Sequence, residues 1–181
     1  MMGKKDSQTS LETLIQKAGD GDKGAFGILF EQTQGAVRSF LWQREHDPDA
    51  LDDLVQRTYL IAFRALSGLR NSERLTSWLL TIAHNEWRRW VKTEVRKPEQ
   101  IEEFDIMAKA VPSRQEISDR QVNLARAIQH LSGRERQLLH LRFEKGLACS
   151  EIAGIFRKPA GTIRSKLHRT ITKLQRMVRT E

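Results

Sequence analysis

Residues 150–177, SEIAGIFRKPAGTIRSKLHRTITKLQRM, decide how the C-terminal third of the chain folds. Residues 150–156 predict a short helix, residues 157–160 a turn that contains Pro159, and residues 161–177 a longer helix. Apolar residues recur in this longer helix at the spacing of one α-helical face, at Ile163, Leu167, Ile171 and Leu174. A short helix, a tight turn and a longer helix form the layout of a helix-turn-helix.

The positive charge of the chain is concentrated in the same third. Residues 126–181 hold 13 Lys/Arg against 4 Asp/Glu, a net charge of +9, whereas residues 1–125 hold 18 against 19, a net charge of −1. From Arg157 to Arg179 there are eight basic residues and no acidic one. A solvated helix face is one interpretation of a charge run. A stripe without acidic residues instead favours a polyanion partner, because bound Lys and Arg release counterions from phosphates.

In a helix-turn-helix the second helix enters the major groove of DNA, and its N-terminal residues reach the base edges. Arg and Lys suit guanine edges, whereas Ser and Thr can contact several bases or a phosphate. Further along the helix, Lys173 and Arg176 are expected mainly to hold phosphate. The predicted DNA contacts are Gly161, Thr162, Arg164, Ser165, Lys166, Arg169 and Lys173.

The rest of the chain also predicts helices. Glycine and proline are few and β-branched runs are short, so strands are not expected. Four apolar stripes of helical spacing lie within residues 11–18, 26–41, 51–66 and 78–90. Ser10 is a plausible N-cap of the first helix, and residues 67–77 are expected to form a polar loop.

A change in composition divides the chain. Residues 98–121 hold six acidic residues against three basic ones and two prolines, as expected for a linker with little packing of its own. The block that follows contains Ser132 and Glu135 at the spacing of a capping box, and Gly146 is expected to end the helix opened there. The prediction is an all-α protein with small helical domains at residues 1–97 and 122–181, joined by an acidic linker.

Several classes of protein are not expected. No apolar run approaches the ~20 residues that span a membrane, and the polar N-terminus has no secretory signal. Cys149 is the only cysteine, and the five histidines lack ligand-like spacing, so neither a disulfide nor a metal site is predicted. The sequence has no catalytic carboxylate pair, phosphate-binding glycine loop or nucleophile–base signature. We therefore expect a cytoplasmic protein that is not an enzyme and needs no cofactor.

Segments in both halves resemble RNA polymerase sigma factors of the ECF (extracytoplasmic function) group. Residues 161–169, GTIRSKLHR, together with Leu131, Glu135-Arg136, Leu147 and Glu151-Ile152-Ala153, are similar to region 4 of that group. Asp53-Leu54-Val55-Gln56 with Thr58-Tyr59 resembles its core-polymerase helix, and residues 78–85, WLLTIAHN, resemble the start of its −10 helix. The resemblance covers roughly residues 10–178, with both halves in the expected order.

The resemblance implies an alternative sigma factor that binds core RNA polymerase and directs it to specific promoters. Region 4 would read the −35 element of promoter DNA, and region 2 would help to melt the −10 element. The implied polymerase contacts are Asp52, Asp53, Leu54 and Gln56. An anti-sigma factor is a further expected partner, and the protein should lie at the nucleoid.

Region 2 would have to hold an unpaired strand, which requires aromatic faces and cations. Trp87 follows Trp78 by nine residues, a rotation of ~180° in an α-helix, so Trp87 is expected to face away from the core if Trp78 faces it. The alternative is that Trp87 packs in a second small core. The implied −10 contacts are Asn71, Ser72 and Arg74 in a base-pocket loop, and Trp87, Arg88, Arg89 and Lys92 on the helix.

The chain departs from the group at several positions. Ala148 stands where the group usually has a capping Ser, and Lys166 where Arg is common; Trp87 stands where a small residue is common, and Arg89 where Asp is common. The rival interpretation is a stand-alone helix-turn-helix regulator that does not bind polymerase. Such a regulator would not need the helix at residues 51–66, whose polar face could otherwise be a plain solvated surface.

Overall fold

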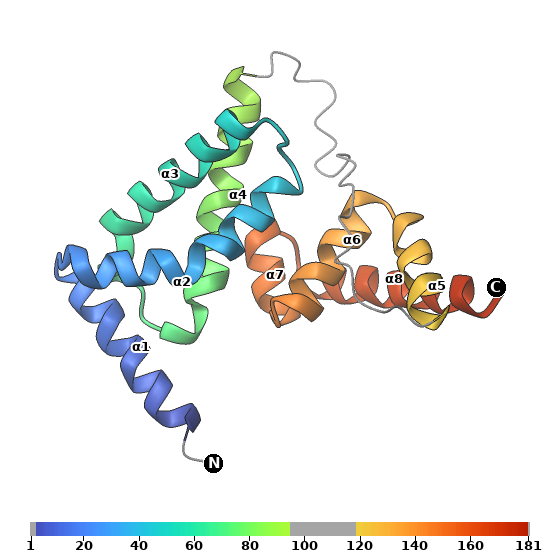
Figure 1. Ribbon diagram of the computed structural model, residues 1–181, viewed down its shortest axis with the longest axis horizontal. Coiled ribbons are helices and arrows are strands. Elements are labelled where there is room, and N and C mark those ends of the chain that lie inside the picture. The colour runs from blue at the N-terminus through green and yellow to red at the C-terminus, as the bar shows by residue number, and fades with distance from the viewer. Residues whose placement is uncertain (1–2, 95–118, 181) are drawn as a thin grey trace. The chain divides into compact units, whose positions relative to one another are not determined.

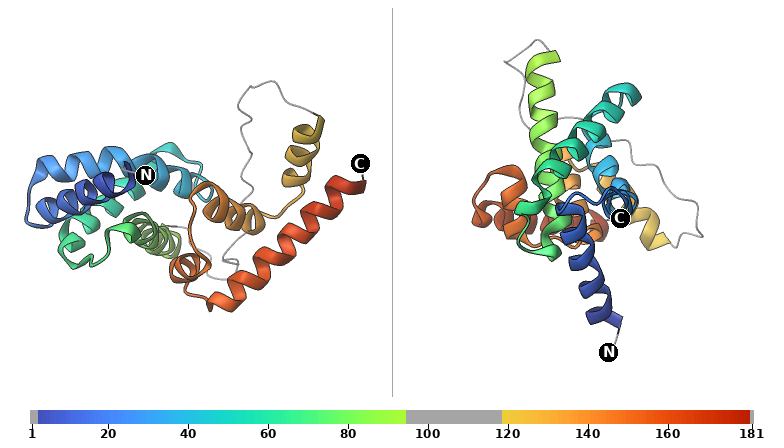
Figure 2. Two further views of the ribbon diagram at one scale, coloured as in Figure 1. Left: turned by 90° about the horizontal axis from the view of Figure 1, so that it is seen from below. Right: turned by 90° about the vertical axis from the view of Figure 1, so that its left-hand side faces the viewer.

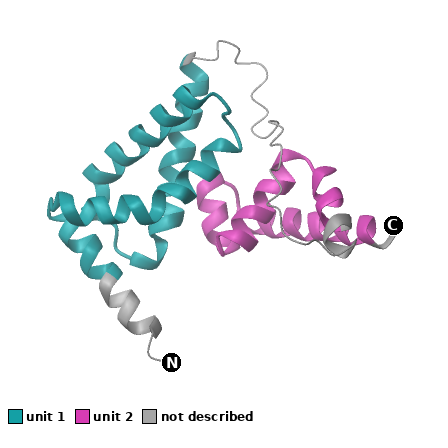
Figure 3. Cartoon of the chain, in the orientation of Figure 1, with its two compact units in different colours: residues 1–98 teal, residues 99–181 magenta. Residues whose placement is uncertain are grey.

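The computed structural model describes the backbone of residues 3–94 and 119–180, and the side chains of residues 11–93 and 124–178. Every element in these ranges is helical, which confirms the predicted all-α class. The chain divides into two compact units, residues 1–98 and 99–181 (Figure 3). Most of the predicted linker, residues 98–118, lies outside the described residues, and its last three residues belong to a helix.

Unit 1 holds four helices and two short 3-10 turns (Figure 1). The helices are α1 (Gly3–Gly19), α2 (Lys23–Trp42), α3 (Pro48–Ala65) and α4 (Leu75–Glu94), and the 3-10 turns η1 (Leu66–Gly68) and η2 (Ser72–Arg74) connect α3 to α4. The predicted N-cap at Ser10 is wrong, because α1 already begins at Gly3. No proline or glycine lies between residues 4 and 18, so the helix extends through the polar residues before Leu11.

Aspartate side chains cap the N-termini of the next two helices. The Asp22 carboxylate accepts hydrogen bonds from the backbone N–H groups of Gly24 and Ala25, at 2.8 and 3.0 Å. Asp47 caps α3 in the same way, and Pro48 occupies its first turn. These caps fix where α2 and α3 begin and therefore which of their residues face the core.

The core of unit 1 lies among α2, α3 and α4, which Figures 1 and 2 show as one bundle with α1. The hydroxyl groups of Thr33 and Tyr59 share a buried hydrogen bond of 2.7 Å between α2 and α3. Burial raises the pKa of Tyr59, although its hydrogen bond with Thr33 opposes the shift. The largest fully buried side chains of this unit are Phe40, Leu41, Leu51, Leu54, Leu66, Leu80 and His84.

Unit 2 contains α5 (Asp119–Gln129), α6 (Gly133–Leu139), a π-helical turn η4 (His140–Glu144), α7 (Cys149–Phe156) and α8 (Ala160–Thr180). The predicted capping box is confirmed, because Ser132 N donates to Glu135 Oε2 at 2.8 Å and Glu135 N donates to Ser132 Oγ at 3.4 Å. Gly146, at φ +68°, follows the helix as predicted. The π-helical turn was not expected from the sequence.

The helix that opens the helix-turn-helix keeps half of a capping box. Ala148 has no side-chain acceptor, but its backbone N–H donates to Glu151 Oε2 at 2.9 Å. The cap does not move to Ser150, which lies within α7. Ile152 and Ile155 of this helix are fully buried, and they pack α7 into the core of unit 2.

Candidate DNA and polymerase interfaces

The turn between α7 and α8 has the hydrogen bonds of a Schellman motif. Lys158 N donates to Ala153 O at 3.0 Å and Arg157 N donates to Gly154 O at 3.3 Å. Arg157 has φ 51° and ψ 44°, the left-handed conformation that glycine usually adopts at this position. Pro159 O then accepts from Thr162 N at 3.0 Å. Three residues, 157–159, separate the end of α7 from the start of α8.

The left-handed arginine leads to a prediction of stability. Arg157→Gly should raise the free energy of unfolding of unit 2 by ~1 kcal/mol, because glycine adopts positive φ without the steric penalty of a Cβ. Arg157→Ala is the control, since it removes the cation but keeps the Cβ, and it should give no such gain. All four tryptophans lie in unit 1, so the measurement is hydrogen exchange of the α7 and α8 amides in the full chain. Equal protection in the two variants would contradict the strain argument.

One face of α8 is exposed, basic and free of acidic residues. Ile163, Leu167 and Thr170 are buried on the opposite face. Of the predicted −35 contacts, Thr162 and Lys166 are half-buried at the edge of this surface, and the Ser165 hydroxyl donates to Gly161 O at 2.9 Å. The predicted contacts that lie fully exposed are Gly161, Arg164, Ser165 and Arg169.

His168 belongs to the same surface and was missed. It is exposed and follows Arg164 by four residues, one helical turn. The spacing from Arg164 was the signal in the sequence that could have identified it.

Lys173 has a partner within unit 2. Its ammonium lies 3.0 Å from Glu135 Oε2 and 3.3 Å from Oε1, which joins α8 to the start of α6. Burial tends to raise the pKa of Glu135, but the hydrogen bonds from Ser132 and Lys173 outweigh it, and the pKa lies below its ordinary value. The charge that the sequence assigns to DNA phosphate is therefore shared with a carboxylate of α6.

The polar face of α3 carries most of the predicted polymerase contacts. Asp52 and Asp53 are exposed, and each forms an ion pair, Asp52 with Arg38 at 2.6 Å and Asp53 with Arg57 at 2.7 Å. Gln56 is exposed beside them. Leu54, the fourth predicted contact, is fully buried, so it is not part of the exposed face. It lies on the apolar face of the same helix, so it supports the surface from below.

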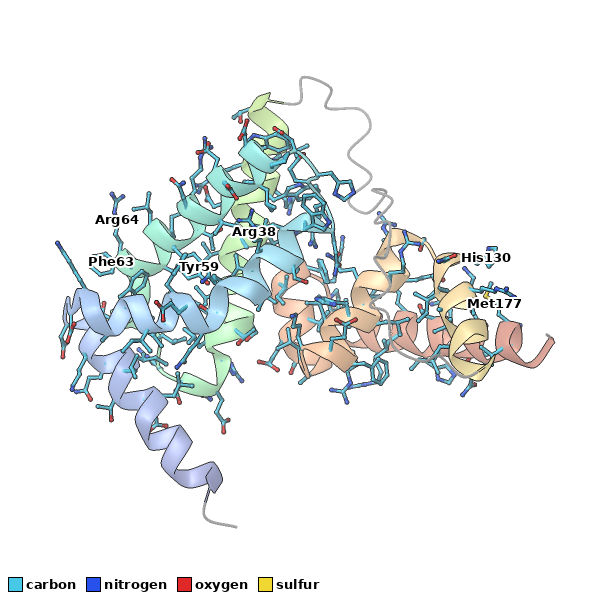
Figure 4. The ribbon with its side chains drawn as sticks, in the orientation of Figure 1. Arg38, Tyr59, Phe63, Arg64, His130 and Met177 are labelled. Atoms are coloured by element: carbon cyan, nitrogen blue, oxygen red, sulfur yellow. The ribbon has the colours of Figure 1, made fainter. Side chains whose placement is uncertain are left out.

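Two apolar side chains that were not predicted extend this surface. Leu60 is 58% exposed and Phe63 is 36% exposed, and they follow Gln56 by four and seven residues on the same side of α3. The Phe63 ring meets the edge of Phe26 at a centroid distance of 4.9 Å, which holds it in position near Arg64 (Figure 4). Leu60 and Phe63 are apolar but do not belong to the apolar stripe within residues 51–66. This departure from the stripe was the signal in the sequence that could have identified them.

The predicted base-pocket loop is built around η1 and η2. Asn71 is exposed, and its side-chain oxygen accepts from Glu73 N at 2.9 Å, which caps η2 and leaves the amide nitrogen as a surface donor. Arg74 is exposed nearby. Ser72 is only 8% exposed, and its hydroxyl donates to Glu12 Oε1 of α1 at 3.2 Å. The prediction that Ser72 contacts DNA is therefore contradicted by its burial.

The predicted exposure of Trp87 is also wrong. Its side chain is 5% exposed and stacks on His84, with ring centroids 6.1 Å apart. The Arg44 guanidinium, from the residues that follow α2, lies 5.5 Å from the Trp87 ring. The expectation depended on Trp78 facing the core, but Trp78 is half-buried and Trp87 is the more buried of the two. Arg44, which follows the end of α2, therefore packs against Trp87 of α4.

Arg44 itself is buried between aromatic rings. Its Cζ lies 3.9 Å from the Phe40 ring centroid, and Nη1 donates to Phe40 O at 2.9 Å. Burial lowers the pKa of the Arg44 guanidinium to about 9, which leaves it charged at neutral pH. This cation is therefore part of the core of unit 1 and is not available to DNA.

The exposed end of α4 retains cations. Arg89 is exposed and pairs with Glu86 at 2.9 Å, Lys92 is exposed, and Arg88 is half-buried. Together with Asn71 and Arg74 they make up the part of the predicted −10 surface that reaches solvent.

Across residues 11–93 and 124–178, no group of three or more His, Cys, Asp or Glu is arranged to hold a metal ion. None of the described helices is both long and apolar enough to cross a membrane.

Two known families match this chain, one within each unit. Residues 29–97 match Sigma-70 region 2, and residues 127–176 match Sigma-70 region 4. A region 2 bundle and a region 4 helix-turn-helix in one chain define a transcription initiation factor of the sigma-70 class. The ECF RNA polymerase sigma-E factor of Escherichia coli (strain K12) is 30% identical over 175 residues, which cover 90% of this chain and 91% of that protein. The chain belongs to the ECF sigma factors.

Other similar proteins share this architecture. The RNA polymerase sigma-H factor of Pseudomonas aeruginosa is 29% identical over 175 residues, covering 90% of this chain and 91% of that protein. The sigma factor RpoE of Bartonella quintana, solved in complex with the anti-sigma factor NepR, has a TM-score of 0.61 at 25% identity, covering 86% of this chain and 98% of that one. CnrH, solved with the cytosolic domain of CnrY, has a TM-score of 0.58 at 20% identity and covers 93% and 97%, which supports the fold alone.

Proposed function

We propose that this protein binds core RNA polymerase through α3 of unit 1 and directs it to promoters whose −35 element is read by α8. The exposed face of α8, basic and without an acidic residue, directly follows the helix-turn-helix turn and carries the proposal. The stand-alone regulator is not favoured, because the same chain also matches region 2. In this function the protein acts by binding and positioning, and polymerase supplies the chemistry.

The −10 element is assigned to the exposed part of unit 1. Asn71 and Arg74 of the loop, with Arg88, Arg89 and Lys92 of α4, would hold the unpaired strand through its bases and phosphates. Extruding a base costs a few kcal/mol, which a loop that hydrogen-bonds the flipped base can offset. Trp87 and Ser72 have no direct part in this surface because they are buried.

The protein partners follow from the same surfaces. Two similar solved proteins are complexes, one with the anti-sigma factor NepR and one with the cytosolic domain of CnrY. We extend this to the present chain and propose that an anti-sigma factor holds it inactive. Binding to polymerase and promoter DNA would place the working protein at the nucleoid in the cytoplasm.

The test of the function is transcription with purified components. Core polymerase is mixed with the full chain, and transcript starts are mapped across genomic DNA. We expect a set of starts that core alone does not produce, preceded by two shared elements at a constant spacing. A chain that binds genomic sites but neither co-purifies with core nor creates starts would support the stand-alone regulator instead.

The polymerase face leads to a specific expectation. The double variant Asp53→Ala/Gln56→Ala should lower the affinity for core polymerase by about tenfold, because truncation of central interface residues typically costs ~1 kcal/mol or more. The matched control is Glu31→Ala/Gln32→Ala, which removes an exposed carboxylate and amide from α2 of the same unit. Affinity is measured by titration of labelled protein into core polymerase. Equal affinities of the two double variants would remove this face of α3 from the interface.

A further inference from the structure

The base-pocket loop is attached to α1, a helix that the proposed function does not use. Ser72, the first residue of η2, donates its hydroxyl to Glu12 Oε1 at 3.2 Å across 60 positions of sequence. The Ser72 side chain is buried, whereas Asn71 directly before it is exposed. The bond therefore fixes the residue next to a proposed base contact.

A second attachment holds the other end of the loop. Gly19, at the end of α1, lies so close to η1 that a Cβ on it would come within 3.3 Å of Ser67 Cα and 3.4 Å of Ser67 N. Ala18 and Leu66, the residues just before Gly19 and Ser67, are buried, so this contact lies at the edge of the core. Both 3-10 turns pack against α1, and Figure 1 shows the segment between α3 and α4 beside it.

We infer that α1 positions the −10 loop and that Glu12 is a positioning residue for base selection at the −10 element. Residues 69–71 are the whole span between the two attached turns. When both ends are held, the direction in which Asn71 presents its amide is fixed before DNA arrives. Preorganised groups lose less entropy on binding and tolerate fewer alternative partners. This inference rests on the proposed function of the loop.

The experiment measures base preference within one holoenzyme. Core polymerase with each full-length variant transcribes a promoter library randomised at the −10 element, and the transcripts are sequenced. Glu12→Ala should lower the preference for the favoured base by about threefold, the order expected when a hydrogen bond is lost. Glu12→Gln should keep the preference, because the amide oxygen accepts the same bond. Glu31→Ala, which removes an exposed carboxylate of α2, is the matched control and should leave it unchanged.

A purely structural role of Glu12 would give a different result. Loss of folded protein lowers transcription from every promoter alike, so it cancels in the preference ratio. A second library, randomised at the −35 element, serves as the reference. Ser72→Ala should reproduce Glu12→Ala, and the double variant should be no worse than either, as expected for two ends of one bond.

The remaining outcomes separate the two levels of the argument. Asn71→Ala reports on the loop itself. If it lowers −10 preference and Glu12→Ala does not, positioning by α1 is overturned while the function of the loop stands. If Asn71→Ala also leaves the preference unchanged, the loop does not read the −10 element. This result would contradict both the proposed function of the loop and its positioning by α1.

Discussion

Trp87→Ala should lower the free energy of unfolding of unit 1 by about 3–5 kcal/mol, the range found for truncated buried aromatic residues. The side chain is 5% exposed and lies between His84 and the Arg44 guanidinium. Its removal would leave a cavity and would also take one aromatic face from a buried cation. A loss of this size is a large fraction of the stability of a small domain.

The exposed Trp42 offers a matched control. It is 43% exposed at the end of α2, so Trp42→Ala should cost about 1 kcal/mol or less. Both variants are compared by urea unfolding of the full chain, followed by tryptophan fluorescence, which reports on unit 1 because all four tryptophans lie there. A Trp87→Ala protein of unchanged stability that fails to open promoters would restore the strand-stacking role.

Arg164→Ala should weaken binding to the preferred −35 sequence by ~1–3 kcal/mol, roughly 5- to 150-fold, and relax the preference at one base pair. Arg164 is exposed in the first turns of α8, where a recognition helix reaches base edges. The measurement is the affinity of the full chain for a panel of −35 duplexes, each differing at one position. The expected pattern is a loss confined to sequences that carried the favoured base.

Arg176→Ala is the comparison for this experiment. It lies twelve residues further along the exposed side of α8, so its contact should be with phosphate. It should weaken every duplex by a similar factor and reduce the salt dependence of binding by about one counterion. If both variants weaken binding to all duplexes by the same factor, Arg164 does not recognise a base.

The parts of the fold that depend on local sequence could be predicted. The capping box of Ser132 and Glu135 depends on two residues three positions apart, and the structure forms it. The apolar spacing of Ile163 and Leu167 placed one face of α8 in the core and left Arg164 exposed. The same periodicity puts Leu54 on the apolar face of its helix, although the resemblance also placed it among the polymerase contacts.

The features that were missed depend on contacts between distant segments. The helical rotation of Trp87 away from Trp78 can be derived from α4 alone, but the residues that cover it follow α2. The burial of Ser72 depends on Glu12, and the partner of Lys173 is Glu135. In each case the pattern within one helix predicts the side on which a residue lies. Whether that side is exposed depends on which other segment packs against it.

The packing of Arg44 on Trp87 also limits how these two positions can change in evolution. The Arg44 guanidinium lies 5.5 Å from the centre of the Trp87 ring. Loss of the tryptophan alone would take one of two aromatic rings from a buried cation, and loss of the arginine alone would remove a group that packs on a buried indole. We therefore expect a change at one of these positions to be accompanied by a change at the other, which a comparison of related sequences would test.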